Sequence, residues 1–163
     1  MKTKTTITEL THDDLVDLFS TALYGSSYLS ADYTIEDRKS VYVPDYACYE
    51  DIIAKILLSG KSVEVTDDYA EGCTYGSLPY KFQDKDDDDS SVIYFVNLES
   101  IKRGLERAAD GTFNAGNDEW TERTKRSARV SFDSFMDEDR CDFDLVRADI
   151  LMQIILFDEI IYG

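Results

Sequence analysis

The spacing of apolar residues changes at Gly60, and this change restricts the chain to folds that mix helices with strands. Before Gly60, apolar residues recur every three or four positions in residues 11–25 and again in residues 46–59. That spacing gives a helix one apolar face. After Gly60, residues 62–66 alternate polar and apolar side chains, as a half-buried strand does. We therefore expect an α+β fold, in which helices pack against a sheet.

Both helices predicted before Gly60 have recognisable ends. Thr11 is placed to cap the first helix and Gly25 to end it, because glycine readily adopts the left-handed conformation that follows many helices. Asp45 is the expected cap of the second helix. Residues 26–45, between the two, are rich in Tyr and Ser and are predicted to be a loop, with a short extended piece at residues 41–43.

The sequence after residue 66 predicts a hairpin followed by helices. β-branched and aromatic residues favour two strands that pair across an acidic loop. No repeat, linker or break in composition divides the chain, so residues 1–163 are expected to form a single domain of four to five helices on a small, mostly antiparallel sheet. Strands are predicted at residues 80–82, 91–96 and 159–162, and helices at residues 97–109, 118–135 and 143–157.

The charge of the chain limits its partners. Thirty-four acids and seventeen bases give a net charge of −17, while a hydrophobic content of 43% is enough to form a core. Such a surface repels nucleic acids and anionic lipid headgroups and attracts cationic proteins. We therefore expect a basic protein as the partner and no direct binding to nucleic acid. No apolar run is long enough to span a membrane and residues 1–6 lack the apolar stretch of a secretory signal, so the cytoplasm is the expected location.

The charge is also distributed unevenly along the chain. Residues 101–129 carry seven bases and five acids, a balance of +2, so the other residues together carry −19. One interpretation is a contact between the two regions, within the molecule or between copies. Another is an acidic face offered to a partner that normally holds nucleic acid, since proteins that bind DNA collect Lys and Arg in grooves that match its phosphates.

Two groups of residues are predicted to contact such a partner. The first is the acidic run of Asp84, Asp86, Asp87, Asp88 and Asp89, and the second is the Tyr-rich segment represented by Tyr28, Tyr33 and Tyr42, because Tyr is well suited to anchoring interfaces. The acidic run does not match the EF-hand pattern, since the required Gly and Glu are missing in either register. Loose, weak binding of a cation by the run is left open, and the remaining alternative is a charged loop that keeps a hairpin edge soluble.

Signals for catalysis are few, and no metal or cofactor is predicted. His12, the only histidine, lies beside two aspartates, but its position off the apolar face of its helix favours a solvent-exposed residue over a catalytic pair. Cys73 lies between glycines, where acids would raise its pKa, so a turn with an incidental thiol is favoured over a nucleophile. Cys48, Cys73 and Cys141 lack any C-x-x-C pair and are expected to be reduced, mostly buried thiols.

Two segments carry a resemblance. Residues 147–163, which include Arg147–Gln153 and Phe157–Gly163, resemble the ending of small acidic proteins carried by phages and mobile elements of gut bacteria, and Asn97–Leu105 is similar to another of their segments. The resemblance covers about a quarter of the chain and assigns no activity to any residue. It implies a context in which small acidic inhibitors of restriction or CRISPR systems are common.

These observations lead to one hypothesis and two alternatives. We expect a non-enzymatic acidic interaction protein, encoded by a phage or mobile element, that mimics nucleic acid and occupies a basic groove of a host defence protein or DNA- or RNA-binding protein. The first alternative is a small enzyme with a site near Cys73 or His12. The second is an accessory protein that associates with itself through its basic region.

Overall fold

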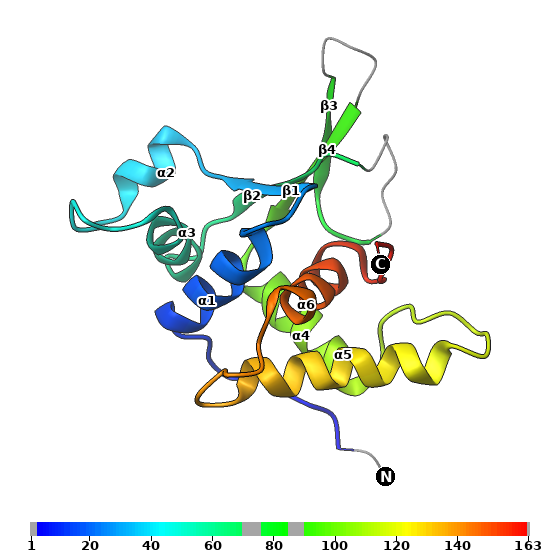
Figure 1. Cartoon of the computed structure of the whole chain (residues 1–163). Coiled ribbons are helices and arrows are strands. Elements are labelled where there is room, and N and C mark those ends of the chain that lie inside the picture. The colour runs from blue at the N-terminus through cyan, green and yellow to red at the C-terminus, as the bar shows by residue number, and fades with distance from the viewer. Residues whose placement is uncertain (1–2, 70–75, 85–89, 163) are drawn as a thin grey trace.

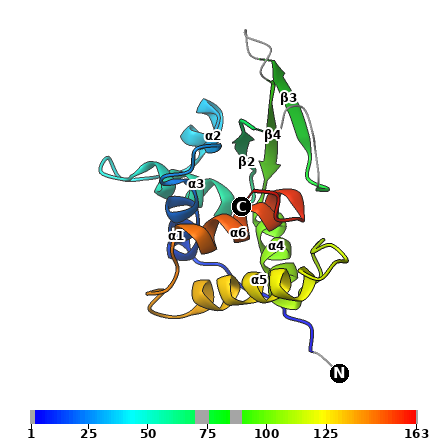
Figure 2. The same cartoon turned by 45° about the vertical axis from the view of Figure 1, so that its right-hand side comes forward.

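The computed structural model describes residues 3–69, 76–84 and 90–162, which form an α+β domain with six helices and one four-stranded antiparallel sheet (Figures 1 and 2). Within these residues, no helix is both long and apolar enough to cross a membrane. The helices are α1 (His12–Leu23), α2 (Ile35–Ser40), α3 (Tyr49–Leu58), α4 (Leu98–Asp110), α5 (Thr121–Met136) and α6 (Leu145–Phe157). The strands are β1 (Leu29–Asp32), β2 (Val63–Asp67), β3 (Tyr80–Asp84) and β4 (Ser90–Val96).

The sheet has the strand order β1-β2-β4-β3. The predicted hairpin of β3 and β4 is confirmed, with Phe82 opposite Val92, and it extends beyond the helices at one end of the molecule (Figures 1 and 2). The first predicted strand is confirmed as β2, whose Val63 and Val65 are buried, as alternation requires. Asp84 belongs to β3 rather than to the loop, and its register partner is Ser90.

The prediction of a loop over residues 26–45 is wrong, because this segment contains both β1 and α2. β1 is four residues long and is defined by its pairing with β2, which places Ala31 opposite Val65. α2 has no buried residue, so it carries no apolar face for a pattern to detect. Its start is marked only by Thr34, whose side chain accepts a hydrogen bond from Asp37 N. The extended piece expected at residues 41–43 is not a strand.

The ends of the helices follow local capping chemistry. α1 begins with the expected capping box, in which Thr11 and Asp14 bond each other's backbone N–H. α3 begins later than predicted, because residues 44–47 form a turn closed by a bond from Ala47 N to Pro44 O. Its cap is therefore Cys48 and not Asp45.

α6 is the central helix, as its apolar character on more than one side predicts. Residues 151–157 are all buried, including Gln153, whose amide side chain takes part in four hydrogen bonds. Its Oε1 accepts from the backbone N–H groups of Ile161 and Tyr162, so the end of the chain is held by a side chain. The strand predicted at residues 159–162 is consequently absent, and only a bridge between Asn114 and Glu159 forms.

Helices α4 and α5 pack on α6 and carry most of the predicted basic stretch. α4 is confirmed from its Asn97 cap to Gly111, which adopts the left-handed conformation with φ 68°. Gly104 allows α4 to approach α6 closely, because a Cβ atom there would lie 2.5 Å from Ile155 Cγ1. α5 begins at Thr121, three residues after the predicted start, and buries Ala128, Phe132 and Phe135.

Candidate protein-interaction surface

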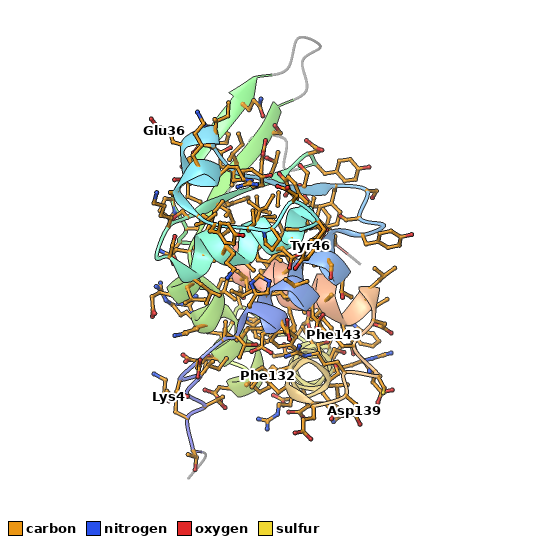
Figure 3. All side chains as sticks on the ribbon, turned by 90° about the vertical axis from the view of Figure 1, so that its left-hand side faces the viewer. Lys4, Glu36, Tyr46, Phe132, Asp139 and Phe143 are labelled. Atoms are coloured by element: carbon orange, nitrogen blue, oxygen red, sulfur yellow. The ribbon has the colours of Figure 1, made fainter. Side chains whose placement is uncertain are left out.

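Acidic side chains gather on the face formed by α1, α2, α3 and the connection between α5 and α6, which we call the acidic face. Residues 12–58 contain nine acids and three bases, and residues 137–149 contain six acids and two bases. Figure 3 views this face, with Glu36 near one end, Asp139 near the other and Tyr46 between them. The two acidic segments, far apart in sequence, therefore share one side of the molecule.

Arg140 joins the two acidic segments. Its guanidinium pairs with Asp14, and with Asp17 at 2.6 Å between Nη1 and Oδ2, so it fixes the α5–α6 connection against α1. Burial alone would raise the pKa of the Asp14 carboxyl, but hydrogen bonds from Thr11 and Arg140 outweigh burial and hold that pKa below its ordinary value. Asp14 is therefore an ionised structural residue at neutral pH.

Exposed tyrosines accompany the acids on this face. Tyr24, Tyr42 and Tyr46 are 80%, 86% and 90% exposed, so their rings are almost wholly available to a partner. Tyr33 is half-buried and its ring lies 4.9 Å from that of Tyr49. The Tyr49 hydroxyl donates to Ala31 O and to Asp32, which fixes this pair of rings on β1. The Tyr-rich segment thus contains both fixed and exposed rings.

Tyr28 does not fit its predicted role as a surface anchor. It is only 8% exposed, and its hydroxyl donates a hydrogen bond to Asp149. Burial, followed by the carboxylate of Asp149, raises the pKa of Tyr28 above its ordinary value. Its ring packs 4.4 Å from that of Tyr162, between centroids. A sequence pattern of aromatic residues cannot separate this buried ring from its exposed neighbours.

Of the acidic run predicted to contact a partner, the structure describes only Asp84. Asp84 ends β3 on the hairpin that extends beyond the helices, away from α2 and α3 (Figure 1). Asp86, Asp87, Asp88 and Asp89 lie outside the described residues. Asp84, the only member of the acidic run within the described residues, is consequently not a neighbour of the exposed tyrosines of the acidic face.

Two adjoining hollows, of about 630 and 350 Å³, meet at Tyr24, Gly25 and Leu145, and we call them together the Tyr24 groove. The groove follows the end of α1 and the start of α6. Besides Tyr24, its exposed apolar side chains are Leu145 and Val146. Glu50 lines the first hollow and Asp149 the second, so apolar surface lies between two carboxylates.

Buried polar contacts fix the floor of the Tyr24 groove. Asp149 accepts hydrogen bonds from the Tyr28 hydroxyl and, at 2.7 Å, from Gln153 Nε2. The Tyr162 hydroxyl lies 3.0 Å from an oxygen of Asp67, which is fully buried in β2. The groove is therefore preformed, and its shape depends on residues from α1, the segment that precedes β1, α6 and the end of the chain, with Asp67 of β2 behind Tyr162.

Leu145 and Val146 are the functional candidates that sequence reasoning missed. They follow the Asp144 cap of α6, whose side chain accepts from Arg147 N. Two consecutive apolar residues in the first turn of a helix, ahead of its buried stripe, are a signal for surface contact. Their position beside the end of α1 cannot be inferred from the spacing of residues in the sequence.

His12 is in contact with a carboxylate, although not with its sequence neighbours. His12 Nε2 lies 2.8 Å from Asp51 Oδ1, and the side chain is only 30% exposed, so the prediction of a solvent-exposed residue is wrong. The other Asp51 oxygen accepts from Cys48 N and Cys48 Sγ. The contact arises because α1 packs against α3 and the first residue of α1 meets the first turn of α3.

This cluster is unsuited to nucleophilic catalysis. The carboxylate lies between the thiol and the imidazole, whereas an activated thiol requires the imidazole as its direct neighbour. The hydrogen bond to Asp51 raises the pKa of the Cys48 thiol, which lowers its thiolate content. Cys48 and Cys141 are exposed, contrary to the expectation of mostly buried thiols, and Cys73 lies outside the described residues.

No group of three or more His, Cys, Asp or Glu side chains is arranged to hold a metal ion within residues 3–69, 76–84 and 90–162. Comparison of the chain with protein-family models, curated proteins and solved structures finds no match.

Proposed function

We propose that the chain is a non-enzymatic interaction protein whose acidic face and Tyr24 groove bind a basic protein. The observation that carries this proposal is the exposure of Tyr24, Tyr42 and Tyr46 among acidic side chains. A surface that served only solubility would need the acids but not the exposed rings. Tyrosines surrounded by charges are typical of interface anchors, several of which contribute about 2 kcal/mol or more each.

The partner class follows from charge. Duplex DNA presents one negative charge per roughly 1.7 Å of axis, and its binding proteins line grooves with Lys and Arg. A folded domain with a net charge of −17 is attracted to such a groove and competes with nucleic acid for it. On this proposal the partner is a host defence protein or another DNA- or RNA-binding protein, in keeping with the resemblance to proteins of phages and mobile elements.

The two acidic regions have different parts in the proposal. The acidic face supplies carboxylates beside aromatic and aliphatic side chains, so it determines how long a complex lasts. Asp84 ends β3, and Asp86–Asp89, which follow it in the sequence, lie outside the described residues; on this proposal the negative charge of the run acts on the rate of encounter. Charges at the edge of an interface change mainly the association rate and its salt dependence.

Competition for nucleic acid tests the proposal. A short labelled DNA or RNA duplex is bound to each of a panel of restriction nucleases, CRISPR effectors and other nucleic-acid-binding proteins, and its displacement is followed by fluorescence anisotropy. We expect displacement from at least one member, weakened by added salt and not reproduced by polyglutamate of equal charge. If the chain displaces nothing, or polyglutamate competes equally, the proposal is wrong.

A matched pair of variants locates the contact. Tyr24→Ser with Leu145→Ser removes two exposed anchors of the Tyr24 groove. Tyr80→Ser with Val130→Ser removes one exposed tyrosine and one exposed aliphatic side chain elsewhere. We expect displacement to weaken at least tenfold in the first variant and to stay unchanged in the second, with circular dichroism confirming that both fold. Equal behaviour of the two variants would exclude the groove.

A further inference from the structure

Lys4, which lies at the end of the molecule opposite Glu36 (Figure 3), lines a basic cleft. The cleft has a volume of about 720 Å³ and lies between the N-terminal segment, the end of α4 and one side of α5. Four bases and two acids line it, which gives a local balance of +2 in a protein of −17. The charged lining residues are Lys4, Lys125, Arg126, Arg129, Asp110 and Glu122.

The acids of this region hold the backbone of the N-terminal segment in place. Both oxygens of Asp110 accept from Thr5 N, at 3.1 and 3.0 Å, and Glu106 accepts from Ile7 N at 2.9 Å. These contacts tie the segment to α4 and so position Lys4 at the cleft. Asp110 is therefore committed to a structural contact, and its charge is already included in the local balance of +2.

The four bases differ in whether other groups of the protein already bind their charged ends. Arg129 donates to Ala109 O and pairs with Asp133, so it joins α5 to α4. The stem of Lys125 lies against Gly111, and its ammonium is 4.0 Å from the exposed carboxylate of Glu122, a separation at which a surface pair contributes little. Among the described residues, Lys4 and Arg126 have no carboxylate within ion-pair distance. Three cations thus remain available to a ligand.

We infer that this cleft binds a compact anion that carries two or more phosphate groups. Its volume lies within the range of small-molecule sites, about 300–1,000 Å³. The guanidinium of Arg126 presents a fork of donors that matches phosphate oxygens, and two ammonium groups add point charges. A ligand with a single charge would gain little from a lining whose balance is only +2.

The size of the ligand follows from the rest of the protein. Beyond residues 101–129 the chain carries −19, and this charge repels any anion that reaches past the cleft. Salt screens that repulsion only beyond about 8 Å at physiological ionic strength. A long nucleic acid would meet the acidic surface, whereas a compact anion stays among the bases. The site is separate from the acidic face and does not depend on the function proposed for it.

Titration with inorganic triphosphate, followed by NMR of the full chain, tests the inference. We expect saturable shifts of the amides of residues 109–112 and 122–129. Lys125→Ser with Arg126→Ser should weaken binding at least tenfold. The control, Arg103→Ser with Arg123→Ser, removes the same charge from exposed arginines of the same region that do not line the cleft, and it should bind as the wild type does. Absence of saturation, or equal weakening in both variants, overturns the inference.

Further ligands identify the chemistry and its source. Citrate, a tricarboxylate, should bind more weakly than triphosphate, and equal binding overturns the assignment to phosphate. A peptide with two phosphoserines tests a protein as the source of the phosphates: its binding at the same amides supports a phosphoprotein ligand, and binding of triphosphate alone supports a free small molecule. The cleft variants should still displace nucleic acid in the competition assay, which keeps this inference separate from the proposed function.

Discussion

The acidic face and the basic cleft use charged residues in opposite ways. On the acidic face, a base, Arg140, is the structural residue, and it fixes α1 to the α5–α6 connection through Asp14 and Asp17. At the basic cleft, acids are structural, because Asp110 and Glu106 hold the N-terminal segment. In each region the minority charge supports the fold, together with a few residues of the majority charge such as Asp14 and Arg129, and the other residues of the majority charge are left at the surface.

This difference shows how structural charges are told apart from surface charges in a highly charged protein. The net charge of −17 alone does not separate carboxylates that stabilise the fold from carboxylates that stay available at the surface. Hydrogen bonds distinguish the two kinds, because a carboxylate that accepts from the backbone or from the half-buried guanidinium of Arg140 is already engaged. What remains on the acidic face lies beside exposed Tyr24 and Tyr46, and what remains at the cleft is Lys4, Lys125 and Arg126.

The largest expected effect comes from the packing that both regions share. Gly104→Ala places a methyl group 2.5 Å from Ile155 Cγ1 and 2.7 Å from Ile155 Cα, so α4 and α6 must move apart. We expect the free energy of unfolding to fall by about 3 kcal/mol, measured by urea denaturation. Alanine favours a helix interior over glycine by up to about 1 kcal/mol, so any gain in stability would show that the contact is not tight.

The next largest effect tests the structural base of the acidic face. Arg140→Gln removes the partner of Asp14 and Asp17, and we expect the free energy of unfolding at neutral pH to fall by about 2 kcal/mol. The control is Lys55→Gln, which removes the same charge from an exposed residue of α3. It should change the free energy of unfolding by less than about 0.5 kcal/mol. Equal effects would mean that net charge, rather than this contact, determines stability.

The same contact gives a pH dependence with a definite sign. The pKa of Asp14 is lower in the folded state than its ordinary value of 3.8. The stabilisation is therefore fully present above that ordinary value and is lost as the pH falls from it through the folded pKa. The free energy of unfolding, measured from pH 6 down to about 2, should fall less in Arg140→Gln than in the wild type. An identical fall in both proteins would exclude Asp14 as the source of this pH dependence.

Sequence patterns predicted the elements whose signals are local. α1 and α4 have both an apolar face and a cap, at Thr11 and Asn97, and both were found with nearly correct ends. β2 and β4 alternate or are rich in β-branched residues. In contrast, β1 exists because β2 supplies its partner, and α2 buries nothing. The strand expected near the end of the chain is replaced by contacts to the Gln153 side chain, which no periodicity reveals.

For the candidate site, the sequence predicted the kinds of side chain that are present but not how they are arranged in space. The excess of acids and the Tyr-rich segment are visible in the sequence, as is the basic balance of residues 101–129. The Tyr24 groove joins the end of α1 to Leu145, and Arg140 meets Asp17 from 123 positions away. Such contacts depend on how the helices pack, and the composition of a segment does not predict them.

The smallest expected effect tests the structural acid at the basic cleft. Asp110→Asn keeps the shape of the side chain but weakens the hydrogen bonds that it accepts from Thr5 N. We expect the free energy of unfolding to fall by about 1 kcal/mol, because a charged acceptor becomes neutral.

The measurement that separates local release from global destabilisation is amide hydrogen exchange at Thr5. Exchange there should accelerate more than exchange of core amides in α6, since only the N-terminal segment loses its anchor. Glu119→Gln, an exposed acid before α5, is the control and should leave both rates unchanged. If Thr5 exchanges at its original rate in Asp110→Asn, the carboxylate does not hold the segment. Asp110 would then belong with the surface charges, and the contrast between structural acids and available bases at this cleft would rest on Glu106 alone.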